Sequence, residues 1–581
     1  MKRTVIACLL VCGILSAGEV FKERVFMLAT NMLPDTKLAE IEKVVLRAHK
    51  AGYNTVFLSD YKFGHPWKLG EKYDNNVKKA VALLRKYNFR IIAGVAPFGD
   101  NCPFLADSPQ LAECLKVVDE PYTVRKGILT PVDVTVNGSF EEGTKGWRLD
   151  PKTDISVDST VAAKGKSSLR FKVTGKEPGR QIRAWYALKT KPFQQYELSF
   201  KFKTRDLKGP GATKGVAIAV VGKVPGLPDG FRYLTYRSKG AFGKKLLNPT
   251  NDWQSGKLYF NTFEFNQVSI ALGCWGGNSG EFWFDDVQIK PASFMNVTRR
   301  PGMGVKITSA DGKQLYTEGK DYAKILDPEA GNFRWAGDFD DQHEPPQVKL
   351  LPGSRIKEGE TVLASYYHPG LSQNHACICL NHPETKKLLT RQIAWVKKVI
   401  APEGYFMGID EHRAYGYDPE CEKSGLSAGE ALNMIARYGY NEIKRIAPGA
   451  KVYMWNDMFD PFSNVKKDRY YYLIKDRNSL WNGWVGLPKD IIIMRWSPDN
   501  ILTRPDAVKG SVEHWTRLGM KIIEWPGYFD GAQFPAQTNP MLEYMKKNPL
   551  CIGAAFAQWG DIKRYNSSFE KFMQVVKEVD R

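Results

Sequence analysis

Length, composition and charge narrow the class of protein. At 581 residues the chain is too long for one hydrophobic core, so we expect about two to four domains. Hydrophobic residues make up 43% and charged residues 25%, which is ordinary for a globular protein. The net charge of +20 comes from lysines and arginines scattered along the chain without a basic tail. We therefore expect no nucleic-acid partner, whereas an acidic polysaccharide stays compatible with the charge.

Residues 1–18 have the pattern of a secretory signal peptide. Lys2 and Arg3 form a short positive region, an apolar stretch runs from 4 to 15, and small residues follow. The apolar stretch before Cys8 is too short for a lipoprotein signal, so we expect no lipid anchor. No later stretch is apolar enough to cross a membrane. We therefore expect a secreted or periplasmic protein without a membrane-spanning segment.

Cysteines are sparse. The chain has nine, and seven remain once Cys8 and Cys12 of the signal peptide are set aside, which excludes a disulfide scaffold. Cys377 and Cys379 are spaced like half of a metal site, but no second pair of cysteines or histidines has a matching spacing. We therefore expect buried thiols, or one or two disulfides, and assign no metal ligands.

From residue 19 to 118 the expected elements alternate between strand and helix. Short apolar runs indicate strands, and the stretches between them have apolar residues at helical spacing. Such an alternation predicts a parallel sheet or barrel. The strands are expected at 24–30, 53–60 and 89–99, and the helices at 38–52 and 77–88.

Between about 120 and 366 the pattern becomes all-β. Alternating strands separated by Pro, Gly and Asn replace the helices. Residues 133–293 form one unit, which opens with VNGSFEEGTKGW and closes with GEFWFDDVQIKPA. The flanking segments 119–132 and 294–366 are expected to be two parts of one small β domain that this unit interrupts.

The unit 133–293 resembles the jelly-roll carbohydrate-binding modules that are appended to bacterial polysaccharide hydrolases. The resemblance rests on the NGSFE opening at 137–141, the GKSSLRF strand and the DDV close at 285–287. It implies a β-sandwich that binds a glycan. Such modules often hold a structural calcium ion, which the resemblance therefore allows here without indicating its ligands.

The alternation of strand and helix resumes in 367–581. Ser427 and Glu430 form a capping box at the start of one helix. Five strands here and three in the first part make eight. This predicts an α/β fold, a (β/α)8 TIM barrel interrupted after its third strand by an all-β insertion. The five strands are expected at 404–410, 451–457, 490–497, 521–528 and 552–561.

Asp410 and Glu411 stand side by side at the end of an apolar run. In a barrel of this kind the catalytic residues lie where strands end. A helix cap needs one carboxylate, whereas two near the barrel axis repel each other, and burial adds to this in raising the pKa of one of them toward neutrality. The pair therefore indicates a general acid. His412 and Arg413 follow, either as support for the site or as surface residues, and His412 is also a candidate contact to the substrate.

Carboxylates and aromatic rings recur at the other strand ends. Cleavage of a glycosidic bond needs an acid for the leaving oxygen, an anion near the oxocarbenium-like transition state and a surface that holds the sugar. Asp60 has an equally good interpretation as a helix N-cap, and Trp496 taken alone would be a core residue. The candidates besides the acidic pair are Asp60, His412, Trp455, Asp457, Trp496, Glu524, Trp525, Tyr528, Trp559 and Asp561.

The segments GIDE at 408–411 and VYMWNDMFDP at 452–461 resemble the family 20 glycoside hydrolases, the β-N-acetylhexosaminidases. The resemblance implies that Glu411 is the general acid/base. It implies that Asp410 orients the 2-acetamido group of the substrate, which acts as the nucleophile and gives retention of configuration. The implied sugar contacts are Trp455, Trp496 and Trp559 as pocket walls and Asp457 as a partner of a hydroxyl or the acetamide.

Two alternatives stay open. Glu411 on strand four and Glu524 on strand seven match the arrangement of a large clan of retaining glycosidases, in which Glu524 would be the nucleophile for a sugar without the acetamido group. A glycan-binding protein without catalysis would instead use its jelly roll, with Trp147, Trp185, Trp253 or Trp275 as stacking candidates. In each case the expected partner is an oligo- or polysaccharide, and we expect no catalytic cofactor.

Overall fold

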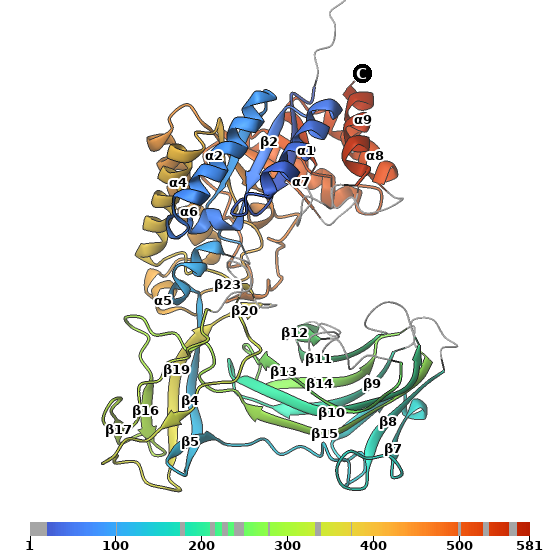
Figure 1. Cartoon of the computed structure of the whole chain (residues 1–581), viewed down its shortest axis with the longest axis vertical. Coiled ribbons are helices and arrows are strands. Elements are labelled where there is room, and N and C mark those ends of the chain that lie inside the picture. Colours follow the sequence, from blue (N-terminus) through green and yellow to red (C-terminus); the bar gives the residue numbers. More distant parts are fainter. Residues whose placement is uncertain are drawn as a thin grey trace, which may run out of the picture.

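The computed structural model shows a barrel with its helices at one end of the molecule and the β-sheets of the insertion at the other (Figure 1). The expected signal peptide, together with Tyr528, Trp559 and Asp561, lies outside the described residues. No helix within the described ranges is long and apolar enough to cross a bilayer. The structure describes residues 20–99, 102–174, 181–208, 215–223, 231–237, 249–276, 279–331, 339–372, 375–497, 501–526, 534–556 and 566–580.

Eight parallel strands close into a barrel, because the last of them, β28, pairs with the first, β1. These strands are apolar and largely buried, as expected for parallel strands that are covered on both faces. The prediction of a parallel barrel interrupted after its third strand by all-β chain is confirmed. In barrel order the strands are β1 (Glu23–Ala29), β2 (Thr55–Ser59), β3 (Arg90–Val95), β22 (Gly404–Met407), β24 (Lys451–Trp455), β26 (Ile491–Arg495), β27 (Ile522–Glu524) and β28 (Cys551–Phe556).

The longer helices pack on the outside of the barrel, and each contributes buried apolar side chains to the barrel core. The predicted capping box is present at the start of α6, where the Ser427 side chain accepts from the Glu430 N–H and the Glu430 carboxylate accepts from the Ser427 N–H. One connection departs from the alternation: residues 456–490, described throughout, contain no α-helix. The helices are α1 (Lys37–Ala51), α2 (Gly70–Lys86), α4 (Pro383–Val399), α5 (Pro419–Ser424), α6 (Ala428–Ile446), α7 (Pro505–Arg517), α8 (Phe534–Lys546) and α9 (Ser568–Asp580).

Next to the barrel, strands from both ends of the insertion form a six-stranded antiparallel sheet in the order β17-β16-β19-β4-β5-β18. β4 leaves the barrel after β3, and β19 returns to it, so their pairing joins the two ends of the insertion. The strands are β4 (Cys114–Arg125), β5 (Ile128–Pro131), β16 (Lys306–Ser309), β17 (Leu315–Tyr316), β18 (Val348–Lys349) and β19 (Thr361–Pro369).

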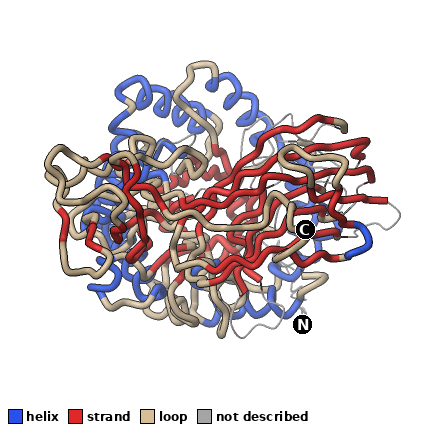
Figure 2. The backbone as a smooth tube through the Cα atoms, turned by 90° about the horizontal axis from the view of Figure 1, so that it is seen from below, coloured by secondary structure: helices blue, strands red, loops and turns tan. Residues whose placement is uncertain are grey.

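The rest of the insertion is a sandwich of two five-stranded antiparallel sheets, ordered β13-β10-β15-β8-β7 and β12-β11-β14-β9-β6. In Figure 2 these strands lie beside one another across one end of the molecule. Phenylalanines at alternate positions, such as Phe200 with Phe202 and Phe282 with Phe284, fill the space between the sheets. The strands are β6 (Trp147–Asp150), β7 (Ile155–Asp158), β8 (Ser168–Thr174), β9 (Ile182–Lys189), β10 (Gln195–Lys208), β11 (Val216–Lys223), β12 (Phe231–Arg237), β13 (Asn251–Asn261), β14 (Gln267–Cys274) and β15 (Ser279–Pro291).

Short paired segments and cysteines complete the fold. β20 (Leu371–Ser372) pairs with β21 (His375–Ala376), and β23 (Ala414–Tyr415) pairs with β25 (Leu473–Ile474). The seven cysteines of the described residues are all buried and unbridged, so of the two expectations for them the buried thiols are the one observed.

Candidate active site

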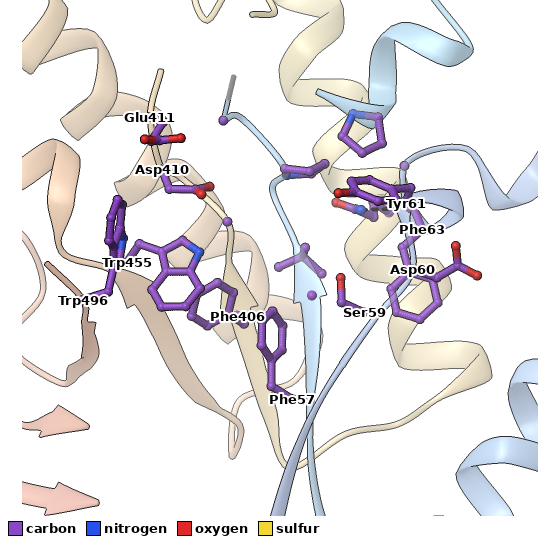
Figure 3. Close-up of a pocket in the computed structure, with 18 of the residues that line it drawn as sticks. Phe57, Ser59, Asp60, Tyr61, Phe63, Phe406, Asp410, Glu411, Trp455 and Trp496 are labelled. Carbon is purple, nitrogen blue, oxygen red and sulfur yellow. Dashed lines mark hydrogen bonds between the residues drawn. The ribbon is translucent and has the colours of Figure 1, made fainter. Parts of the chain in front are cut away.

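A cavity of about 280 Å³ opens at the carboxyl ends of the barrel strands. All eight strands point the same way, so the residues that follow them gather at this one end. Figure 3 shows the acidic pair on one side of the cavity and aromatic rings beneath it. The main side chains that line it are Phe57, Ser59, Asp60, Tyr61, Phe63, His375, Gln392, Phe406, Asp410, Glu411, Trp455, Trp496 and Trp525.

The acidic pair reaches this cavity because β22 is continued by two further backbone hydrogen bonds. Gly408 donates to the Val95 carbonyl at 2.9 Å, and Phe98 donates to the Gly408 carbonyl at 2.9 Å. Asp410 and Glu411 therefore leave the barrel next to the end of β3. Both line the cavity, and the Glu411 side chain is 32% exposed. A carboxylate that is half-buried at a cavity wall can contact a ligand and exchange a proton with it.

Glu411 adopts a left-handed backbone conformation with φ of 45°. For a residue other than glycine this costs about 1–3 kcal/mol and persists only where the surroundings hold it. The Glu411 N–H donates to the Asp457 carboxylate at 2.9 Å, and Arg413 donates to the Glu411 carboxylate at 2.8 Å. The Arg413 guanidinium in turn lies 4.6 Å from the centre of the Tyr472 ring. Backbone and side chain of Glu411 are thus both fixed.

Asp457 supports the pair instead of lining the cavity, which corrects its predicted role as a sugar contact. Its side chain is fully buried and accepts from the Glu411 N–H and, at 2.8 Å, from the Asn464 amide. Burial raises the pKa of Asp457 to about 7, and the charge of Glu411 acts in the same direction. Asp457 is therefore a buried carboxyl group that titrates near neutrality directly beneath Glu411.

Aromatic rings form the wall opposite the opening. Trp455 ends β24, and its ring lies 4.9 Å from that of Trp525 and 4.7 Å from that of Phe406. Trp496 follows β26, and its backbone N–H donates to the Asn456 side-chain oxygen at 2.9 Å. The structure thus brings the predicted Trp455 and Trp496 together at one cavity (Figure 3), and Trp525 lines the same cavity. Flat apolar faces beside carboxylates suit a sugar ring, which has apolar faces and polar edges.

Asp60 and His412 both have structural roles at the site. The Asp60 carboxylate points away from the acidic pair (Figure 3) and accepts from the N–H groups of Met32 and Lys62 and from the Tyr73 hydroxyl. It caps a short turn, one of the two expectations for it, and Asp60 is also among the residues that line the cavity. His412 is fully buried with its Nδ1 2.7 Å from the Phe98 carbonyl, and burial lowers its pKa to about 4. It is neither a surface residue nor a part of the cavity wall.

The structure also does not support the predicted role of Glu524 as a nucleophile. Its two carboxylate oxygens accept from the Arg495 guanidinium at 2.7 and 2.8 Å, and both side chains are almost fully buried. Glu524 is not among the residues that line the cavity. This ion pair is bidentate and shielded from water, so the Glu524 carboxylate stabilises the packing of β26 against β27.

Several lining residues were missed by the sequence reasoning. Phe57, Ser59 and Tyr61 follow one another at alternate positions along and beyond β2, so the period of the strand could have indicated them. Gln392 had no such signal, because it comes from the middle of α4. Its amide donates to the Phe63 carbonyl at 2.8 Å and accepts from the Ala96 N–H at 2.9 Å, which fixes the loops after β2 and β3.

Comparisons with known proteins were made at the level of families, curated sequences and solved structures. No family model matches the chain, and no curated protein matches it. A structure described as "CBM4 structure and function" is 16% identical over 27% of this chain and 99% of its own, with a TM-score of 0.21. The CBM22-1 xylan-binding domain from Paenibacillus barcinonensis is 15% identical over 26% of this chain and 91% of its own, with a TM-score of 0.20.

One of the similar structures extends over nearly the whole chain. A rhamnosidase from Novosphingobium sp. PP1Y is 9% identical over 97% of this chain, with a TM-score of 0.34. The match spans 59% of the length of the rhamnosidase. At these identities and TM-scores the likenesses carry no argument about the substrate or the mechanism of this protein, which therefore rest on its own site.

The buried ion pair between Arg495 and Glu524 leads to a prediction about stability. Replacing Glu524 with glutamine leaves the Arg495 charge buried without its partner, and breaking such a pair costs about 3–5 kcal/mol. We expect Glu524→Gln to lower the melting temperature markedly. The matched control is Glu513→Gln, which removes an exposed partner of Arg517 and should change little. Equal melting of the two variants would contradict the structural role assigned to Glu524.

The raised pKa of Asp457 leads to a prediction about how the stability of the folded protein depends on pH. Between pH 3.8, the ordinary pKa, and about 7, the folded protein holds a proton that the unfolded chain has released. The contribution of Asp457 to the free energy of unfolding is therefore full at low pH, and it is lost as the pH rises through 7. We expect the melting temperature of Asp457→Asn, measured against that of wild type, to rise between pH 4 and 7.5. The exposed Asp133→Asn variant should show no such trend, and a flat difference for Asp457→Asn would refute the assignment.

Proposed function

We propose that the protein is an exported glycoside hydrolase that binds a sugar ring between the Asp410–Glu411 pair and the aromatic wall at Trp455 and Trp496. The observation that carries this proposal is the meeting of two adjacent carboxylates with tryptophan rings in one cavity. Its volume of about 280 Å³ is just below the range of about 300–1,000 Å³ for ligand sites, which suits one sugar unit. The proposal treats the closed barrel as a (β/α)8 TIM barrel, with its chemistry at the carboxyl ends of the strands.

Glu411 is proposed as the general acid/base. Arg413 donates to the Glu411 carboxylate at 2.8 Å and so orients it at the cavity wall. From this position the carboxyl group can give a proton to the leaving oxygen and later take one from water.

Asp410 is proposed to orient the 2-acetamido group of a β-linked N-acetylhexosaminide, so that the substrate supplies the nucleophile. The arrangement of the site favours this over a nucleophilic Glu524. In retaining enzymes with a protein nucleophile the two carboxyl groups stand about 5–5.5 Å apart across the sugar. Glu524 is instead bound to Arg495 outside the cavity wall, whereas Asp410 lines the cavity beside Glu411.

The sandwich of the insertion is proposed to bind the same oligo- or polysaccharide. Of the four stacking candidates, Trp147 is in the core and packs against Phe140, so it takes no part in binding. Trp185 lies on the outer face of its sheet under two guanidinium groups, those of Arg148 and Arg183. The structural calcium ion stays a prediction.

Replacing Glu411 with glutamine tests the enzyme. Loss of general acid–base catalysis typically costs a factor of about 10²–10⁴ in rate. We expect Glu411→Gln to lose hydrolysis of aryl β-N-acetylglucosaminide or N-acetylgalactosaminide by that factor while it still binds the sugar. The measurement is release of the aryl group, together with calorimetric binding of the free sugar. Glu513→Gln, an exposed change of the same kind, serves as the control.

Hydrolysis of a panel of aryl glycosides by the wild-type protein separates the alternatives. The panel contains the plain glucoside and galactoside beside the two acetamido sugars. Cleavage of the plain sugars alone would rule out assistance by the acetamide. Binding of glycans without hydrolysis of any of the sugars by the wild-type protein would refute the enzyme and favour a glycan-binding protein.

A further inference from the structure

A second cluster of reactive side chains lies where the barrel meets the insertion. Cys379 follows β21, Cys421 is in the short helix α5, and Glu113 comes directly before β4. In Figure 1, α5, β23 and the start of β4 lie near one another at this junction. All three side chains are buried, and their ligand-type atoms lie within 4.8 Å of one another. The proposed reaction at Glu411 uses none of them.

The spacing of the three groups matches the requirements of a tetrahedral metal ion. The two sulfur atoms are 3.9 Å apart, and the Cys421 sulfur is 3.2 Å from Oε2 of Glu113. With Zn–S bonds of about 2.3 Å, the edge between two sulfur ligands of a tetrahedron is about 3.8 Å. A disulfide would need the sulfur atoms at about 2.05 Å, so they would have to move toward each other.

Neighbouring groups hold the three side chains in this arrangement. Oε1 of Glu113 accepts from the consecutive N–H groups of Gly416, Tyr417 and Asp418, which leaves Oε2 directed at Cys421. The Asn381 amide nitrogen lies 3.3 Å from the Cys421 sulfur, a position from which it can donate to a thiolate. Such outer contacts orient metal ligands and stabilise their charged forms.

The charges of the cluster also point to a cation. Buried carboxylates are normally paired with a cation or bind a metal. Arg300, the buried cation of this junction, is engaged by Asp418. The Glu113 carboxyl group of this cluster accepts from backbone N–H groups and from the Cys421 thiol. A buried carboxyl group beside two thiols is a donor set that suits a thiophilic divalent ion.

We infer that Cys379, Cys421 and Glu113 form a binding site for a thiophilic divalent cation of the Zn²⁺ type, with water as the fourth ligand. Binding replaces the protons of the two thiols, which leave to solvent, and no oxidation takes place. The ion would join the first residue before β4 to the chain that follows Glu411, and so tie the insertion to the mouth of the barrel. The inference is independent of the proposed hydrolase.

The test is titration of the reduced, metal-free protein with Cd²⁺ and Zn²⁺. We expect one equivalent of Cd²⁺ to bind with the ultraviolet charge-transfer absorption of a Cd–thiolate bond. Cys379→Ser and Cys421→Ser should each weaken binding by more than the roughly 100-fold that loss of an outer-sphere contact can cost. The matched control is Cys274→Ser, which removes a buried thiol of the sandwich. Glu411→Gln should bind the metal as wild type does.

A measurement on the wild-type protein covers the case in which the serine variants fail to fold. X-ray absorption of the zinc-loaded chain should show two sulfur neighbours at about 2.3 Å and oxygen neighbours at about 2.0–2.2 Å. A zinc environment without sulfur, or no stoichiometric binding of either metal, would overturn the inference. So would peptide mapping of the unreduced protein that finds a Cys379–Cys421 disulfide.

Discussion

The hydrogen bond from the Glu411 N–H to the buried Asp457 carboxylate determines how the acidic pair meets the cavity. It joins the ends of two neighbouring strands, β22 and β24, and holds Glu411 in a backbone conformation that glycine would adopt more easily. With the backbone fixed, Arg413 fixes the side chain. Contacts from residues of the barrel therefore hold the strained Glu411 backbone in place. Asp457, hidden from the cavity, contributes to the site through Glu411.

The insertion is bonded to the same stretch of chain that carries the acidic pair. Glu113, directly before the insertion, accepts three backbone hydrogen bonds from residues 416–418, and Arg300, which follows the sandwich, pairs with Asp418. Both contacts are buried, where hydrogen bonds and charges interact more strongly than in water. Residues at the start of the all-β region and after its sandwich thus hold the loop that follows Glu411. The insertion is part of the support of the barrel mouth.

Local patterns were sufficient for the outline of the barrel. The apolar runs at β1, β2 and β3 and the capping box at Ser427 depend on residues that are neighbours in sequence, and the structure has both. The described segment between β24 and β26 contains no α-helix. No local pattern indicated this departure from the alternation, because the segment consists largely of loops held by contacts from elsewhere, such as the pairing of β25 with β23. For the site, strand ends indicated Asp410, Trp455 and Trp496, which do line one cavity.

The sequence by itself determined which residues stand at strand ends and that two carboxylates are adjacent, because these properties follow from order along the chain and from the periods of strands and helices. Only the tertiary structure decided which of those residues face the cavity. Asp457 and Glu524 have the same chemistry as the acidic pair, yet they lie outside the cavity wall and bind buried partners, the Glu411 backbone and Arg495. Asp60 lines the cavity, but its carboxylate caps a turn. The partner of Cys379 was likewise decided by folding, since Cys421 and Glu113 are remote in sequence and meet only where the insertion rejoins the barrel. Burial and pairing depend on segments far apart in the chain, so no local pattern records them.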